Sequence, residues 1–186
     1  MTSNKIIIGF IGEIASGKGT LAKYVRETHH GESFRHSSIL RDILKRIYIP
    51  DSRENLQTLS FNLRNAFGQE ILSETMKHQI DESSSSLITI DGIRRESDIA
   101  NFRELPNFFL IAIDATPEVR YERLVKRAEN PGDTEKTWED FLEDGKAEAE
   151  IRIRDLMEKA NFRVDNNGTH EESYAQIDEI LKKIHI

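Results

Sequence analysis

Residues 12–20 read Gly-Glu-Ile-Ala-Ser-Gly-Lys-Gly-Thr and directly follow the apolar run at 5–11. This order predicts a strand, a tight loop and the start of a helix. Gly12 and Gly17 stand five positions apart, so the backbone can wrap with its N–H groups inward, and the helix beginning near Lys18 adds the positive end of its dipole. The loop is therefore predicted to hold phosphates, with Lys18 beside the β- and γ-phosphates of a nucleotide. An ordinary glycine-rich turn would not need the lysine at this spacing.

Strand-like and helix-like segments alternate along the rest of the chain. Apolar runs or shorter strand-like segments lie at 5–11, 33–36, 87–91, 108–114 and 162–165. The stretch 53–79 has helical periodicity and Gly68 is expected to divide it, whereas the apolar spacing from Thr137 to Met157 predicts a single helix. Alternation of this kind predicts one α/β domain, with a five-stranded parallel sheet flanked by helices and ligands outside the carboxyl ends of the strands.

The composition limits the classes of protein to consider. The chain has 186 residues, no cysteine and a net charge of −7, with a sequence pI near 5.4. The absence of cysteine excludes disulfides and thiol metal sites, and the negative charge argues against a nucleic-acid partner. No apolar stretch approaches the roughly 20 residues that span a bilayer, and the start of the chain leads straight into the first strand. We therefore expect a soluble, cytoplasmic protein with no membrane partner.

The ending Gly-Lys-Gly-Thr of the loop resembles the P-loop nucleoside monophosphate kinase superfamily, adenylate kinase above all. Ile14 and Ala15 stand where that family usually has proline and a further glycine. The resemblance implies a three-layer P-loop kinase fold that binds ATP and Mg²⁺. It assigns the following residues to ATP: Gly12, Ala15, Ser16, Gly17, Lys18, Gly19 and Thr20, with Thr20 also a candidate magnesium ligand.

A second motif, Asp91-Gly92-Ile93-Arg94-Arg95, follows the buried strand-like run at 87–91. It resembles the Asp-Gly-x-x-Arg of adenylate-kinase-like enzymes. By this resemblance Asp91 holds Mg²⁺ through water and Arg95 contacts the acceptor phosphate, with Arg94 as a neighbouring acceptor contact. The alternative is a turn with a solvated salt bridge, which the position after a buried strand disfavours.

Other arginines take roles only through the resemblance. Arg41 lies in a segment similar to the one that opens the acceptor-binding helices, and Arg64 in one similar to phage-type deoxynucleoside monophosphate kinases. Arg123 and Arg127 match an Arg-Leu-x-x-Arg pattern, in which one arginine stacks on the ATP base and the other contacts phosphate. For each of these arginines the alternative is a solvated helix face with ion pairs.

Residues 129–136 have the composition of a short lid. The flanking Trp138-Glu139-Asp140-Phe141 and the later Asn166-Asn167-Gly168-Thr169 are similar to predicted archaeal nucleotide kinases and, more loosely, to dephospho-CoA kinases. Those families usually carry an Arg-Asp pair after the phenylalanine. Here Glu143-Asp144 follows, with Lys146 the nearest cation. A lid arginine is therefore missing from the expected place.

Together these features predict a single kinase domain over 1–186, with an acceptor-binding helical insertion at about 37–80. The expected activity is ATP- and Mg²⁺-dependent phosphorylation of a nucleoside or deoxynucleoside monophosphate by a monomer or homodimer, with Lys18, Asp91, Arg95, Arg123 and Arg127 as catalytic residues. Dephospho-CoA is the alternative acceptor. A regulatory P-loop ATPase or nucleotide switch is the alternative from another class, disfavoured by the number of arginines.

Overall fold

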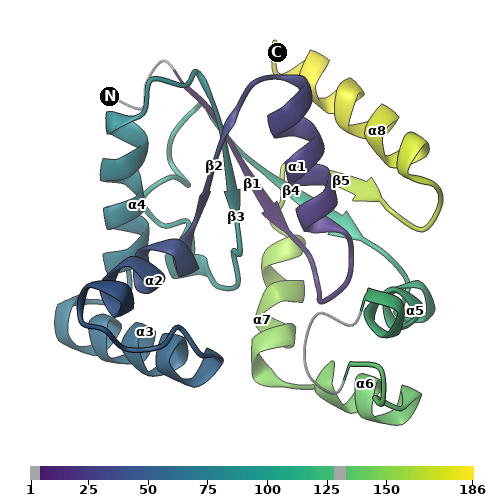
Figure 1. The fold of residues 1–186 in the computed structure, drawn as a ribbon. Helices are drawn as coiled ribbons and strands as arrows, with labels where there is room; N and C mark the ends of the chain where they lie inside the picture. The colour runs from purple at the N-terminus through teal and green to yellow at the C-terminus, as the bar shows by residue number, and fades with distance from the viewer. Residues whose placement is uncertain (1–4, 128–132) are drawn as a thin grey trace.

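A computed structural model describes residues 5–127 and 133–186. Its centre is a five-stranded sheet with the order β2-β3-β1-β4-β5, in which every pair of neighbours is parallel (Figure 1). The strands are β1 (Ile6–Ile11), β2 (Glu32–Arg35), β3 (Leu87–Asp91), β4 (Phe108–Asp114) and β5 (Phe162–Asp165). The fold class predicted from the sequence is confirmed.

Helices connect the strands and cover the sheet. They are α1 (Lys18–Thr28), α2 (His36–Arg46), α3 (Arg53–Phe67), α4 (Ile71–Glu82), α5 (Pro117–Arg127), α6 (Trp138–Asp144), α7 (Glu148–Met157) and α8 (His170–Lys183), with a 3₁₀ turn, η2, at Glu96–Asp98. None of the helices in the described ranges is long and apolar enough to cross a membrane.

Two hydrophobic clusters lie on opposite faces of the sheet and give the molecule its three layers. On one face α1 and α8 cover the strands, with Leu21 and Ile177 buried among them. On the other face α4, α7 and the segment after β3 pack on the strands through Met76, Leu156 and Phe102. Since β1 and β3 are covered on both sides, their side chains are almost all buried, as the continuous apolar runs predicted.

The two helix pairs α2–α3 and α5–α6 lie beyond the carboxyl ends of the strands, one pair on each side (Figure 1). The helical stretch 53–79 is divided as predicted, because Gly68 ends α3 with a φ of 101°. The expected single helix from Thr137 to Met157 is wrong: it is interrupted between Asp144 and Glu148, where Gly145 ends α6. The interruption gives the chain a turn at this edge of the sheet, where parallel α/β proteins bind ligands.

Candidate active site

The glycine-rich loop connects β1 to α1 and takes the geometry that phosphate binding requires. Gly17 precedes the first turn of α1 with a φ of 98°, a conformation that favours glycine. A Cβ on Gly12 would collide with the carbonyl oxygen of Ile113 and with Ser16 Oγ, whereas one on Gly19 would meet nothing within 4 Å. The loop backbone is therefore tightly held at Gly12 and Gly17 and open at Gly19, beside the amino end of the helix.

Asn166, directly after β5, fixes this loop from the far side. Its Nδ2 donates to the carbonyl oxygen of Ser16 at 2.7 Å, and its Oδ1 accepts from the hydroxyl of Ser173 at 2.6 Å. A Cβ on Gly17 would collide with Asn166 Nδ2. Because Asn166 and Ser173 are both buried, these bonds hold the loop against α8.

Lys18 is the charged group around which the site converges. Its Nζ donates to the carbonyl oxygen of Glu13 at 2.9 Å, so the side chain folds back along the loop. Desolvation lowers the pKa of Lys18 from 10.5 to about 8; Asp91 and Glu150 oppose this, and the nearby cations Arg94 and Arg127 add to it. The structure thus brings Lys18, Asp91, Arg94 and Arg127 together from three separate segments.

Asp91 ends β3 and points into the same region. Its Oδ1 accepts the N–H of Gly92 at 2.7 Å, and its Oδ2 pairs with Arg35, the last residue of β2. The side chain of Asp91 is 11% exposed and that of Arg35 is 56% exposed. Arg35 is therefore the more exposed partner of a nearly buried carboxylate. Arg35 was not predicted as a site residue, because nothing in the sequence of the short strand β2 distinguishes its last residue.

Glu13 connects the loop to the helices on the α5–α7 side. Its carboxylate accepts from Arg120 of α5 at 3.2 Å and from Arg154 of α7 at 2.8 Å. Arg154 also donates to the carbonyl oxygen of Gly145 at 2.8 Å, at the turn between α6 and α7. This contact brings an α7 cation to the phosphate loop, although no spacing pattern in the sequence predicts it.

Several buried polar atoms near the loop have no hydrogen-bond partner within the described residues, among them Ser16 Oγ and Arg123 Nη1. Arg123 Nη1 lies 3.9 Å from the position of a Cβ on Gly17, and burial lowers the pKa of Arg123. Buried donors are normally paired, so these atoms mark a place where an anionic ligand would supply acceptors.

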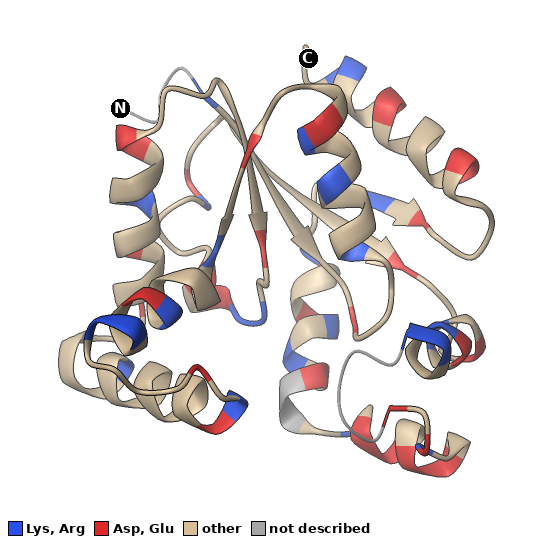
Figure 2. Ribbon diagram, in the orientation of Figure 1, with Lys and Arg blue, Asp and Glu red and all other residues tan. Residues whose placement is uncertain are grey.

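Figure 2 shows basic residues in blue where the chain leaves β3 at the carboxyl edge of the sheet. Arg94 and Arg95 lie in this segment, which is called the arginine turn below. The backbone N–H groups of Arg94 and Arg95 donate to Asp98 Oδ2 at 2.9 and 3.2 Å. The side chain of Arg95 lines a groove of about 350 Å³ between η2 and α7, where Arg152 and Lys159 add positive charge and Glu96 and Asp155 negative charge.

The remaining expected acceptor arginines lie in α2 and α3 and are engaged within the protein. Arg41 forms an exposed ion pair with Asp51 at 2.8 Å. Arg64 is 5% exposed and pairs with Asp98 at 2.7 Å. An acceptor role for either side chain stays a prediction, and the geometry of Arg64 places it behind the arginine turn.

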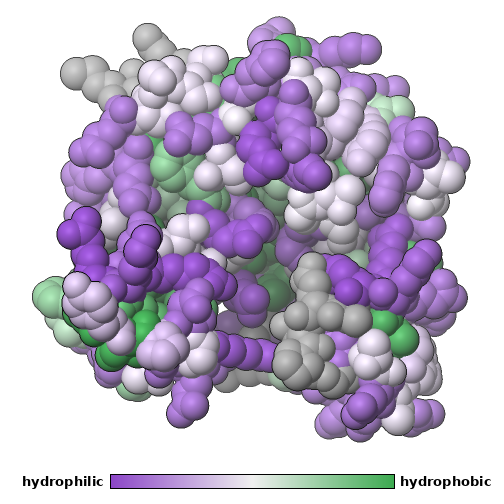
Figure 3. Space-filling model, viewed as in Figure 1, coloured by the Kyte–Doolittle hydropathy of each residue, from purple (hydrophilic) through white to green (hydrophobic). Residues whose placement is uncertain are grey.

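A second groove, of about 460 Å³, lies between α2, α3 and α4 and is mainly apolar, with Asp42 and Arg46 at its wall. Figure 3 shows hydrophobic surface on this side of the molecule, at the lower left, and the exposed apolar residues there include Tyr48, Phe61 and Phe67. The residues that line this groove include none from the phosphate loop and none from the segment 91–95 after β3.

The expected lid at 129–136 lies partly outside the described residues, which resume at Asp133. In the described part Tyr121 donates to the carbonyl oxygen of Lys136 at 2.9 Å, and Lys136 pairs with Asp144 of α6. The aromatic rings of Tyr121, Trp138 and Phe141 pack together beside Ala15 of the loop. The structure thus connects α6 to α5 and to the phosphate loop.

A parallel sheet in the order 2-3-1-4-5, with a glycine-rich phosphate loop after β1, defines a P-loop kinase-like protein. Solved structures with this fold include shikimate kinase from Bacteroides thetaiotaomicron and TT1252 from Thermus thermophilus. Both superpose with a TM-score of 0.60 at 13% and 15% identity, over 97% of this chain and 99% and 98% of theirs.

The chain belongs to the AAA domain family, which matches residues 11–141, and to the family of UPF0200 proteins. The UPF0200 protein of Methanoregula boonei is 30% identical over 178 residues, which cover 94% of this chain and 95% of that protein. The one from Sulfurisphaera tokodaii is 28% identical over 180 residues, covering 96% and 97%.

Proposed function

We propose that the protein transfers the γ-phosphoryl group of ATP to the phosphate of a nucleoside or deoxynucleoside monophosphate. The observation that carries this proposal is the convergence of Lys18, Arg94 and Arg127 with the carboxylate of Asp91 at the carboxyl edge of the sheet. Phosphoryl transfer needs two anionic substrates held in line and their charge neutralised, rather than covalent help from the protein. Cations that come from several elements are better explained by two anionic substrates than by a single bound nucleotide.

The donor nucleotide binds along the loop in this proposal. The loop N–H groups and the amino end of α1 receive the phosphates, Lys18 contacts the β- and γ-phosphates, and Thr20 faces the metal. The unpaired donors Ser16 Oγ and Arg123 Nη1 support this placement, since a phosphate would supply their acceptors. Binding would also draw Lys18 from the carbonyl oxygen of Glu13, where its Nζ rests.

The residues present fit Mg²⁺. This ion keeps several waters and takes one or two protein oxygens together with substrate phosphates. Asp91 offers a nearly buried carboxylate, and Thr20 an exposed hydroxyl at the start of α1. When bound, Mg²⁺ neutralises charge on the transferred phosphoryl group. Arg35 would have to release Asp91 Oδ2, and its 56% exposure supports such a movement.

The acceptor lies on the side of β3 in this proposal. Arg95 and Arg94 contact its phosphate, the groove beside η2 receives part of it, and Arg41 approaches from α2. An acceptor phosphate oxygen forms the new bond to the γ-phosphorus while the bond to the ADP oxygen breaks. Arg123 and Arg127 neutralise the transferred charge, and the lid excludes water so that ATP is not hydrolysed.

The test is ADP formation from ATP and Mg²⁺ with single acceptors: ribo- and deoxynucleoside monophosphates, dephospho-CoA and shikimate. We expect at least tenfold stimulation by one nucleoside monophosphate. Arg95→Ala should raise the KM for that acceptor and leave the KM for ATP unchanged, with Arg103→Ala as the matched control on the same segment. Stimulation by dephospho-CoA or shikimate alone would show that this compound, and not a nucleoside monophosphate, is the acceptor. Acceptor-independent ADP formation would indicate a regulatory ATPase.

A further inference from the structure

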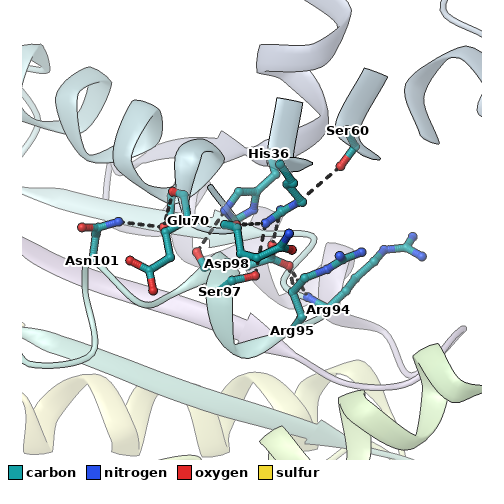
Figure 4. A network of polar contacts seen from close by, with 11 residues as sticks. His36, Ser60, Glu70, Arg94, Arg95, Ser97, Asp98 and Asn101 are labelled. Atoms are coloured by element: carbon teal, nitrogen blue, oxygen red, sulfur yellow. Dashed lines mark hydrogen bonds and ion pairs between the residues drawn. The ribbon is translucent and has the colours of Figure 1, made fainter. Parts of the chain in front are cut away.

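A buried polar network surrounds Asp98, just behind the arginine turn (Figure 4). The side chains of Asp98 and Arg64 are each 5% exposed, and Arg64 Nη2 donates to Asp98 Oδ1 at 2.7 Å. Arg64 comes from α3 and Asp98 from η2, so this ion pair joins the helical insertion to the segment after β3. Removing one partner of such a pair leaves an uncompensated buried charge, which is strongly unfavourable.

The second oxygen of Asp98 determines the shape of the arginine turn. Asp98 Oδ2 accepts the backbone N–H groups of both Arg94 and Arg95, and the N–H of Asp98 donates back to the carbonyl oxygen of Arg95 at 3.0 Å. One oxygen of the Asp98 carboxylate therefore holds the backbone of both arginines, and the other oxygen is bound by Arg64 of α3. This backbone fixes the points from which the side chains of Arg94 and Arg95 leave the chain.

Arg64 spreads its remaining donors over the neighbouring segments. Its Nη1 donates to Ser97 Oγ at 3.1 Å and to the carbonyl oxygen of Gln69, between α3 and α4, and its Nε donates to Ser60 Oγ at 3.4 Å. The fork of the guanidinium thus contacts α3, the α3–α4 junction and η2 at once, which a lysine could not do.

The start of α2 joins the same network. His36 Nε2 lies 3.0 Å from the carbonyl oxygen of Asp98, and the preceding Arg35 pairs with Asp91. Burial lowers the pKa of His36, and the nearby Arg64 and Arg95 lower it further against the opposing effect of Asp98. The contact of His36 with the carbonyl oxygen of Asp98 therefore joins the start of α2 to the network that holds α3 and the arginine turn.

We propose that Arg64 and Asp98 are positioning residues, which couple the direction of Arg94 and Arg95 to the position of α3. The proposal rests on the proposed function, because it concerns the acceptor side of that site. When α3 moves toward or away from the acceptor, the turn moves with it, since separating the two would break the buried ion pair. Arg64 thereby acts on the acceptor through the turn and does not touch it.

The kinetic test uses Arg64→Lys, which keeps the charge beside Asp98 and loses the fork, with Arg103→Lys as the matched control. Arg103 pairs with Glu96 at 3.7 Å in the same segment, and in the described part of the chain it forms neither a hydrogen bond nor an ion pair with Asp98. In Arg64→Lys we expect the KM for the acceptor to rise about tenfold, with kcat and the KM for ATP within about threefold of wild type. A merely structural role would lower the folded fraction, which reduces kcat and leaves both KM values unchanged. An acceptor KM within twofold of wild type would overturn the proposal.

A second readout does not depend on finding an acceptor. Amide hydrogen exchange of Arg94 and Arg95 is compared by NMR in wild type, Arg64→Lys, Asp98→Asn and Arg103→Lys, relative to the β3 amides of Ile88 and Ile90, which report global opening. We expect amide exchange at Arg94 and Arg95 to accelerate about tenfold in Arg64→Lys and Asp98→Asn and to stay unchanged in Arg103→Lys. Unchanged exchange in Arg64→Lys and Asp98→Asn would refute the positioning role. Absence of acceptor stimulation in wild type, with accelerated exchange in the variants, would refute the proposed function while leaving the coupling in place.

Discussion

Replacing Lys18 should make the protein more stable while it removes nucleotide binding. The pKa of Lys18 lies at about 8 in the folded state and at 10.5 without burial. This difference corresponds to a cost of about 3 kcal/mol at neutral pH, and the partial exposure of Lys18 makes that figure an upper limit. Loss of the hydrogen bond to the carbonyl oxygen of Glu13 costs about 1 kcal/mol. For Lys18→Met we therefore expect a net gain of about 1–2 kcal/mol in the free energy of unfolding at pH 7.

The pH dependence separates this effect from general repacking. Because the folded pKa is depressed, the unfolded state binds more protons between about pH 8 and 10.5, and the cost of burying Lys18 is relieved as pH rises through this window. We expect the difference in free energy of unfolding between Lys18→Met and wild type, measured by urea unfolding, to fall by at least half between pH 7 and about pH 9.5. Lys23→Met is the control, since Lys23 is 63% exposed on the same helix and should change stability by less than about 0.5 kcal/mol. A difference that is absent at pH 7, or independent of pH, would refute the reasoning.

Four further substitutions test the geometry of the site. Gly17→Ala should destabilise the protein by about 2 kcal/mol or more in urea unfolding, because φ is positive at Gly17 and Asn166 leaves no space for a Cβ. Gly19→Ala should be neutral, or stabilising by up to about 1 kcal/mol, in the same measurement, because a Cβ on Gly19 would meet no atom within 4 Å. Asn166→Ala should lower the free energy of unfolding by about 1–3 kcal/mol and weaken ATP binding, which calorimetry measures. Unchanged stability and ATP affinity would show that Asn166 does not hold the loop. Arg35→Gln should lower the Mg²⁺ concentration for half-maximal activity about two- to fivefold, because it frees Asp91 of a partner worth about 0.5–1 kcal/mol; a rise would contradict the metal role of Asp91.

The fold could be predicted because local signals in this chain agree with one another. The apolar run of β1, the spacing of Gly12 and Gly17 and the alternation of elements all indicate a parallel sheet with a phosphate loop. Gly68 was a correct break point because its positive φ is a backbone property that the residue type reveals. The interruption at Gly145 was missed, since the apolar spacing runs on through it and only tertiary contacts, such as that of Arg154 with the Gly145 carbonyl, favour the turn.

The site could be predicted where a residue belongs to the loop, to the motif at the end of β3 or to the arginine pattern of α5. Lys18, Asp91, Arg94 and Arg127 are such residues, and the structure brings them together. Arg154 and Arg35 reach the site across long sequence separations, so no spacing rule reports them. Arg64 was singled out because its segment resembles a kinase acceptor region. Its burial against Asp98 could not be predicted, because that burial depends on how α3 packs against the segment after β3.

The central strand has a consequence for synthesis on the ribosome. β1 emerges first, yet its partners are distant: Ile6 pairs with Leu87, and Ile7 with Phe108. At about 5–20 residues per second, β1 waits several seconds or longer for either neighbour, and parallel pairings of such separation form slowly. The apolar segment of β1 therefore has no partner strand until residue 87 has been added to the nascent chain.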